Sequence, residues 1–132
     1  MNYLDEQGRN QELVLSIQEA LDANDLLSVR NALADLHPSE LADLLESLPG
    51  EIRDELWVHV ERDVEGNVLA HANDSVRAAL LENMAPQEVA AATSNLDSDD
   101  AADILQDLPE SLADEVLRSM DEQNRARIAS VL

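Results

Sequence analysis

The sequence has no cysteine and no phenylalanine, and its aromatic residues are one tryptophan and one tyrosine. Without cysteine there is no disulfide, no thiolate metal site and no cysteine nucleophile. Any core must therefore be built from leucine, alanine, valine and isoleucine, whose aliphatic side chains suit closely packed short helices. At 132 residues, the chain has the size of one domain that can bury a substantial core.

Positive charge is also scarce. The 8 basic residues are all arginine and face 29 aspartates and glutamates, which gives a net charge of −21. Nucleic acid is not expected as a partner, because binding it requires a basic surface, and an anionic membrane surface is disfavoured for the same reason. Cations, basic protein surfaces and solvent remain, and cations that screen or bind the surface should stabilise the fold.

Long apolar runs and enzyme motifs are missing as well. No stretch approaches the roughly 20 apolar residues needed to cross a bilayer, and the first residues lack the layout of a signal peptide. There is no dinucleotide fingerprint, phosphate-binding loop or nucleophile elbow. We therefore expect a cytosolic chain that is not an enzyme and does not itself span a membrane.

What the sequence does contain is an internal repeat. Residues 36–60 align without a gap on residues 96–120, and cutting the chain every twelve residues from Leu36 gives eight blocks. The first and ninth positions of every block are apolar, and the tenth position breaks only at Thr93. Apolar residues at positions one, five or six, nine and ten lie on one face of a helix. Each block is therefore predicted to form one short helix.

Helices of about nine residues are too short to be stable alone, so each aliphatic face must be buried between neighbouring helices, as in solenoids. Residues 11–21 and 26–36 read as slightly longer helices, and residues 1–9 as a frayed N-terminus. We predict an all-α, right-handed superhelical solenoid of about ten short helices over residues 10–132.

Gly66 and Leu132 each lead to a further prediction about the array. Gly66 falls inside the third block and costs about 1 kcal/mol relative to alanine, so we expect a distorted or mobile helix there. At the other end, Leu132 lands on the first position of a further block. The array is therefore predicted to be a fragment of a longer protein.

Two blocks carry a family resemblance: LHPSELADLLESLP, from Leu36, and LDSDDAADILQDLPESLADEVL, from Leu96. They resemble the intracellular N domain of MgtE-type magnesium transporters, and the similarity covers roughly residues 10–132. The resemblance implies a cytoplasmic regulatory domain of a bacterial inner-membrane transporter that forms a homodimer. It further implies that Mg²⁺ bridges the acidic faces of this domain and of adjacent CBS domains in the same polypeptide, holding the pore shut.

An alternative stays open at this point. Leu-Pro helical repeats also occur in the flagellar rotor protein FliG, whose superhelical segments are similar to this domain. The sequence is therefore also compatible with a FliG-like helical-repeat scaffold that binds a protein partner.

The best local cation site is on the block that begins at Leu96. Asp99 and Asp103 are four residues apart and so on one helical face, with Asp100 beside them. Mg²⁺ keeps several waters and typically takes one or two carboxylates from protein, so a weak site can be sparse. By motif position, the resemblance gives the inter-domain Mg²⁺ role to Asp99 and Asp103, together with Asp100. The plainer interpretation is that acids in a first turn only favour the helix dipole.

Other polar residues are less suggestive. Asn67 stands where a relative can carry an ion-binding acid, and Glu65 or Asp63 would have to substitute for it. Glu40 and Asp43, in the earlier copy of the repeat, are expected to form a solvated face. The histidines that share the twelfth position, His59 and His71, lack the spacing of helical zinc ligands and are expected at helix ends.

Overall fold

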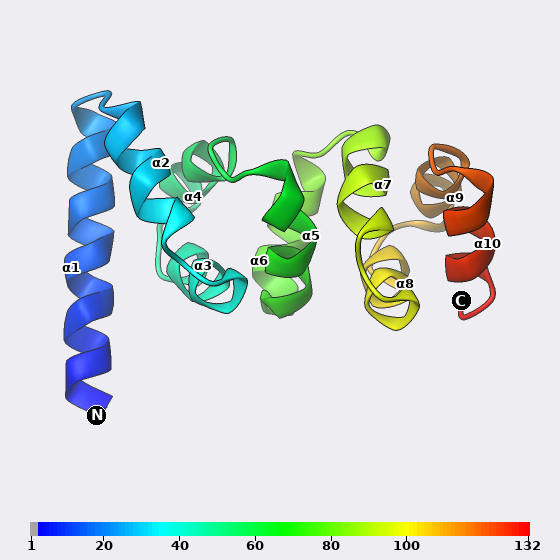
Figure 1. Ribbon diagram of the computed structural model, residues 1–132, viewed down its shortest axis with the longest axis horizontal. Helices are drawn as coiled ribbons and strands as arrows, with labels where there is room; N and C mark the ends of the chain where they lie inside the picture. The colour runs from blue at the N-terminus through cyan, green and yellow to red at the C-terminus, as the bar shows by residue number, and fades with distance from the viewer. Residues whose placement is uncertain (1–2) are drawn as a thin grey trace. The chain divides into compact units, whose positions relative to one another are not determined.

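The computed structural model describes residues 3–132, with side chains described from Gln11 onward, and this part of the chain is built from helices (Figure 1). The helices are α1 (Tyr3–Asp22), α2 (Leu26–Ala34), α3 (Pro38–Glu46), α4 (Gly50–Trp57), α5 (Arg62–His71), α6 (Asp74–Glu82), α7 (Pro86–Ser94), α8 (Ser98–Gln106), α9 (Glu110–Arg118) and α10 (Glu122–Ala129). The predicted all-α class and the expected succession of about ten helices are confirmed. None of the helices in the described residues is both long and apolar enough to cross a membrane.

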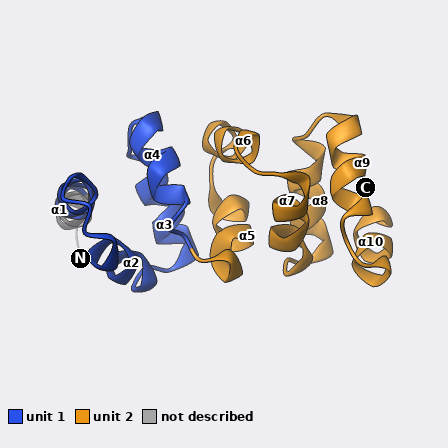
Figure 2. Ribbon diagram, turned by 90° about the horizontal axis from the view of Figure 1, so that it is seen from above, with its two compact units in different colours: residues 1–60 blue, residues 61–132 orange. Residues whose placement is uncertain are grey.

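The chain forms two compact units, an N-terminal unit of residues 1–60 and a C-terminal unit of residues 61–132 (Figure 2). In the N-terminal unit, α1 packs against α2. The largest fully buried side chains of this unit are aliphatic: Ile17, Val29, Leu41, Leu44, Leu45 and Leu56. Its core is thus made of the residue types that the composition left available.

In the C-terminal unit, helices pack mainly against the next helix but one. α5 contacts α7, α7 contacts α9, and α8 contacts α10. Sequential helices also touch, as α7 and α8 do. The core consists of one to four aliphatic side chains from each helix, including Val68, Leu80, Ile104, Val116 and Ile128, each 0 % exposed. Short helices are thus stabilised by stacking, which their own length could not provide.

The 12-residue register is confirmed by burial. The ninth position of every block is at most 3 % exposed, from Leu44 in the first block to Ile128 in the last. The tenth position is buried in the first six blocks, including at Thr93, whose hydroxyl donates a hydrogen bond of 2.7 Å to the carbonyl of Val89 one turn earlier. Because that bond satisfies the buried hydroxyl, a threonine fits into an otherwise apolar position.

One helix boundary differs from the prediction. Helix α1 begins at Tyr3, eight residues before the predicted start at Gln11. The fraying predicted for residues 1–9 stays a prediction, and residues 1–2 lie outside the described ones. Leu4, Glu6 and Gln7 are good helix formers, so they can extend a helix once its later turns are packed.

Gly66 does not distort its helix, contrary to the expectation, while the expected mobility stays a prediction. Helix α5 runs through Gly66 without interruption, and the residue is buried. A Cβ atom at this position would overlap the carbonyl oxygen of Ala92 in α7 and lie 3.3 Å from Cγ of Leu96. Glycine therefore allows α5 and α7 to approach closely, and the prediction of a weak point is corrected to one of tight packing.

Candidate functional site

The three predicted aspartates lie on the exposed side of α8. The helix buries Ala101, Ala102, Ile104 and Leu105, while Asp99, Asp100 and Asp103 are exposed to solvent. Asp99 and Asp100 are in the first turn, where a negative charge is favoured by the helix dipole. One short helix therefore presents three carboxylates, and we call these three residues the α8 acidic face.

Within the described residues, no carboxylate of the α8 acidic face takes part in a hydrogen bond or an ion pair. Nor do three or more His, Cys, Asp or Glu side chains anywhere in that part of the chain form a group that could hold a metal ion. The aspartates can therefore supply oxygen ligands from one side without enclosing an ion. Exposed, unpartnered carboxylates suit hydrated Mg²⁺, which keeps waters and takes one or two protein carboxylates.

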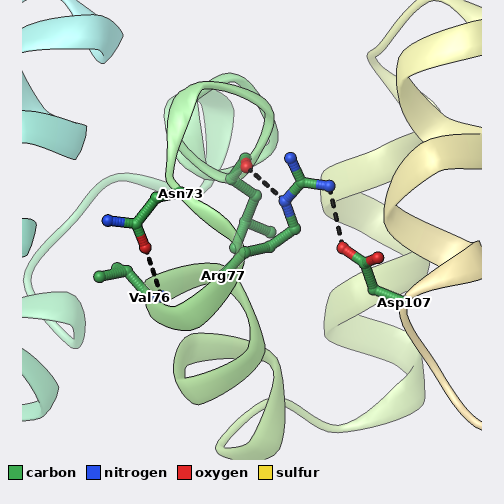
Figure 3. A network of polar contacts seen from close by, with 5 residues as sticks. Asn73, Val76, Arg77 and Asp107 are labelled. Carbon is green, nitrogen blue, oxygen red and sulfur yellow. Dashed lines mark hydrogen bonds and ion pairs between the residues drawn. The ribbon is translucent and has the colours of Figure 1, made fainter.

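Two arginines from other helices hold the ends of α8. Arg127 of α10 donates to the carbonyl of Leu96 (2.9 Å), to Oγ of Ser98 (3.0 Å) and to the carbonyl of Ser94 (3.2 Å), all at the start of α8 or just before it. At the other end, the C-cap residue Asp107 forms an ion pair of 3.0 Å with Arg77 of α6 (Figure 3). These contacts link residues 29 to 33 positions apart.

Arg77 also fixes the turn between α5 and α6. Its Nε donates to the carbonyl of Leu69 at 3.0 Å, and its side chain is only 12 % exposed. In the same turn, Oδ1 of Asn73 accepts a hydrogen bond of 2.9 Å from the backbone of Val76 and so caps α6 (Figure 3). A half-buried guanidinium that bonds a carbonyl and a carboxylate in two directions is held in one place.

Arg77 and Arg127 are not among the residues that the sequence pattern predicted for the site. The sequence did contain a signal for Arg77. Arginine occupies the sixth position of three blocks, at Arg53, Arg77 and Arg125, whereas most other blocks have an apolar residue there. No comparable signal marks Arg127, since its partners are about thirty residues away and share no local pattern with it.

The acids of α5 lie in a different setting. Asn67 and Asp63 are exposed, whereas Glu65 is half-buried. Burial raises the pKa of Glu65, the charge of Glu88 in α7 raises it further, and Arg62 opposes both effects. Neither Glu65 nor Asp63 joins the α8 acidic face in a group of three ligands within the described residues. The substitution of Glu65 or Asp63 for Asn67 as an ion ligand stays a prediction.

The remaining polar predictions concern helix ends. His71 is the last residue of α5, and His59 follows the end of α4, so both lie at helix ends as expected. Glu40 is exposed, but its carboxylate accepts a hydrogen bond of 3.0 Å from the backbone of His37 and so caps α3. Glu40 and Asp43 are thus both exposed as predicted, and Glu40 has a capping role in addition.

One protein family matches the sequence. The sequence model of the MgtE intracellular N domain matches residues 36–132. Among solved structures, the chain is similar to the soluble part of a magnesium transporter, with a TM-score of 0.79, 20 % identity, and coverage of 93 % of this chain and 49 % of that one.

A second solved structure is the cytosolic domain of the Mg²⁺ channel MgtE in complex with ATP. It matches with a TM-score of 0.76 and 26 % identity, and covers 89 % of this chain and 49 % of that one. The chain thus spans about half the length of both structures, and both confirm the predicted all-α helical solenoid. No curated protein sequence gave a significant match.

Proposed function

The chain belongs to the MgtE intracellular N domain family, and from this premise we propose that it is the Mg²⁺-sensing regulatory domain of a magnesium transporter or channel. The observation that carries the proposal is the α8 acidic face, three exposed carboxylates without a hydrogen bond or ion pair among the described residues. The two similar structures come from magnesium-transporting proteins, which supports the choice of ion.

The charge distribution supports a cation as the regulatory ligand. The net charge is −21, because 8 arginines face 29 aspartates and glutamates, and two of these arginines, Arg53 and Arg77, already pair with Asp54 and Asp107. Arg77 and Arg127 also donate hydrogen bonds to backbone carbonyls. Little positive charge is therefore left to neutralise the exposed acids, and a divalent cation would relieve their mutual repulsion.

The proposed mechanism uses α8 as half of a site. Asp99 and Asp103, with Asp100, would bind hydrated Mg²⁺ from one side, and the other ligands would come from a second acidic surface, that of CBS domains in the same polypeptide. Bound Mg²⁺ supplies the positive charge that lets two acidic surfaces meet. When Mg²⁺ is scarce, the uncompensated carboxylates of α8 repel that surface. The domain then separates from its partner, and the pore can open.

The proposal includes the setting of the full-length protein. We place the chain at the cytoplasmic side of a bacterial inner membrane, as the N-terminal regulatory part of a homodimeric transporter. The exposed carboxylates act in it as reversible ion ligands, so the domain is proposed to be regulatory and not an enzyme.

A helical-repeat scaffold of the FliG type remains the second candidate. It is favoured by large apolar side chains exposed on the N-terminal unit: Leu15 at 59 %, Leu27 at 71 % and Val58 at 78 % exposed. Side chains of this kind are common anchors in contacts between proteins. This alternative predicts no specific response to Mg²⁺.

Thermal unfolding of the 132-residue chain in Mg²⁺, compared with a sodium salt of equal ionic strength, tests the proposal. The test variant is Asp99→Asn with Asp103→Asn, and the control is Glu110→Gln with Asp114→Asn. The control pair is also exposed, also four residues apart, and removes the same charge from α9.

We expect Mg²⁺ to raise the melting temperature of the wild-type chain and of the control beyond the ionic-strength effect. The α8 variant should lose most of that excess. An equal excess in both variants would mean that Mg²⁺ only screens the surface, and no excess in any protein would favour the scaffold.

A further inference from the structure

Helix α8 has both of its ends fixed from outside its own sequence neighbourhood. At its start, the N-cap Asp97 makes no side-chain cap hydrogen bond. Instead, Arg127 bonds the residues on either side of Asp97, at the carbonyl of Leu96 and Oγ of Ser98. At its end, the C-cap carboxylate of Asp107 is bonded by Arg77. The helix that carries the acidic face is therefore held by two arginines from α10 and α6.

In the other copy of the repeat, the ends of α3 are capped by residues that are close in the sequence. In α3, the backbone of Ser39 donates to Nδ1 of His37 at 3.1 Å, and Oγ of Ser47 donates to the carbonyl of Asp43 at 2.9 Å. Sixty residues before Arg127 the repeat has Asn67, so no arginine stands at the corresponding position of the earlier copy.

We infer that Arg77 and Arg127 are positioning residues, which hold α8 so that Asp99 and Asp103 present their carboxylates to one divalent cation in a fixed arrangement. This inference rests on the proposed function. If the ends of this nine-residue helix were not fixed, binding one ion with two of its side chains would order the helix. The lost conformational entropy would then weaken ion binding. Fixing both ends beforehand removes part of that cost, as outer partners do for metal ligands in general.

The arginines have an opposing electrostatic effect that the test must separate. A positive guanidinium near the acidic face repels an incoming cation, so a neutral substitution would combine looser positioning with stronger attraction. Lysine keeps the charge but has a single ammonium group in place of the planar fork. Its single nitrogen cannot take the place of both Nη1 of Arg127, which bonds Leu96 and Ser98, and Nη2, which bonds Ser94. Arginine-to-lysine variants therefore isolate the positioning effect.

The test is an NMR titration of the 132-residue chain with Mg²⁺ at constant ionic strength, following the amides of Asp99 and Asp103. The variant is Arg77→Lys with Arg127→Lys, and Arg127→Lys alone is measured in case the pair unfolds. The control is Arg30→Lys with Arg118→Lys, because both of these arginines are exposed. All proteins are compared well below their melting temperatures, so that a loss of stability alone does not change the apparent affinity.

We expect the dissociation constant for Mg²⁺ to rise about threefold to tenfold in the test variant, below the loss of 10–100-fold seen when outer partners of closed metal sites are removed. It should stay unchanged in the control. If Mg²⁺ still shifts the α8 amides but the dissociation constant is unchanged both in Arg77→Lys with Arg127→Lys and in Arg127→Lys alone, the positioning role is wrong. The proposed function is not affected by that result. Absence of Mg²⁺ shifts at α8 in the wild-type chain would overturn the proposed function as well.

Discussion

Helices α3 and α8 are two copies of one sequence block, and they use their acids differently. Both begin after an extended N-cap, bury two adjacent aliphatic residues near their ends, and are followed by a Leu-Pro pair. In α3, the carboxylate of Glu40 is part of a capping box with His37. In α8, Asp99, Asp100 and Asp103 take part in no such bond within the described residues. The repeated positions therefore build the helix, and the positions that differ decide whether its carboxylates remain available to a ligand.

The first prediction contrasts two glycines, one in each unit, and has the largest expected effect. Gly66→Ala should destabilise the chain by about 3 kcal/mol, because its Cβ would overlap backbone atoms of Ala92. Gly50→Ala should be neutral or stabilising by about 0.5 kcal/mol, because its Cβ would lie 3.5 Å from Arg53. Urea unfolding measures both values. Equal stabilities for the two variants would refute the close approach of α5 and α7.

The second prediction tests the difference between the two N-caps. His37→Ala should cost about 1 kcal/mol, since the imidazole accepts the backbone N–H of Ser39 at 3.1 Å. Asp97→Ala should cost less than about 0.5 kcal/mol, because Asp97 makes no side-chain cap bond. Denaturant unfolding of the two variants gives the comparison. A larger loss for Asp97→Ala would contradict the account of how α8 begins.

The smallest predicted effect concerns Glu65, whose pKa is raised first by burial and then by the charge of Glu88. A raised pKa means that the folded chain binds this proton more tightly than the unfolded chain. The contribution of Glu65 to the free energy of unfolding therefore decreases as pH rises from its ordinary pKa through its raised pKa.

Replacing Glu65 by glutamine should remove this pH dependence and stabilise the chain at neutral pH by a few tenths of a kcal/mol, since solvent screens a half-exposed group. Glu82→Gln, at an exposed position of α6, removes the same charge and serves as the control. Unfolding curves at acidic and neutral pH distinguish the two. The explanation is wrong if both variants change stability equally at both pH values.

The repeat made much of the fold predictable from local information. Apolar residues at fixed positions revealed both the helices and their buried faces, so Leu44 and Ile104 could be assigned to the core in advance. The i, i+4 spacing likewise predicted that Asp99 and Asp103 share a side of one helix. These features depend on residues within one block, where helical geometry relates sequence to space.

What could not be predicted depends on contacts between blocks. The fit of Gly66 requires the carbonyl of Ala92 in another helix, and a propensity scale records only the local cost of glycine. The partners of Arg127 are 29 to 33 residues away. In each case the deciding neighbour lies outside the repeating pattern.

The most direct test of the central claim compares the two repeat copies within one NMR titration of the 132-residue chain with Mg²⁺ at constant ionic strength. Our account predicts saturable amide shifts concentrated at residues 99–103 of α8, with only small, non-saturating shifts at residues 39–43 of α3. Equal, non-saturating shifts in both helices would contradict it, because Mg²⁺ would then act on the whole acidic surface and not on the α8 acidic face.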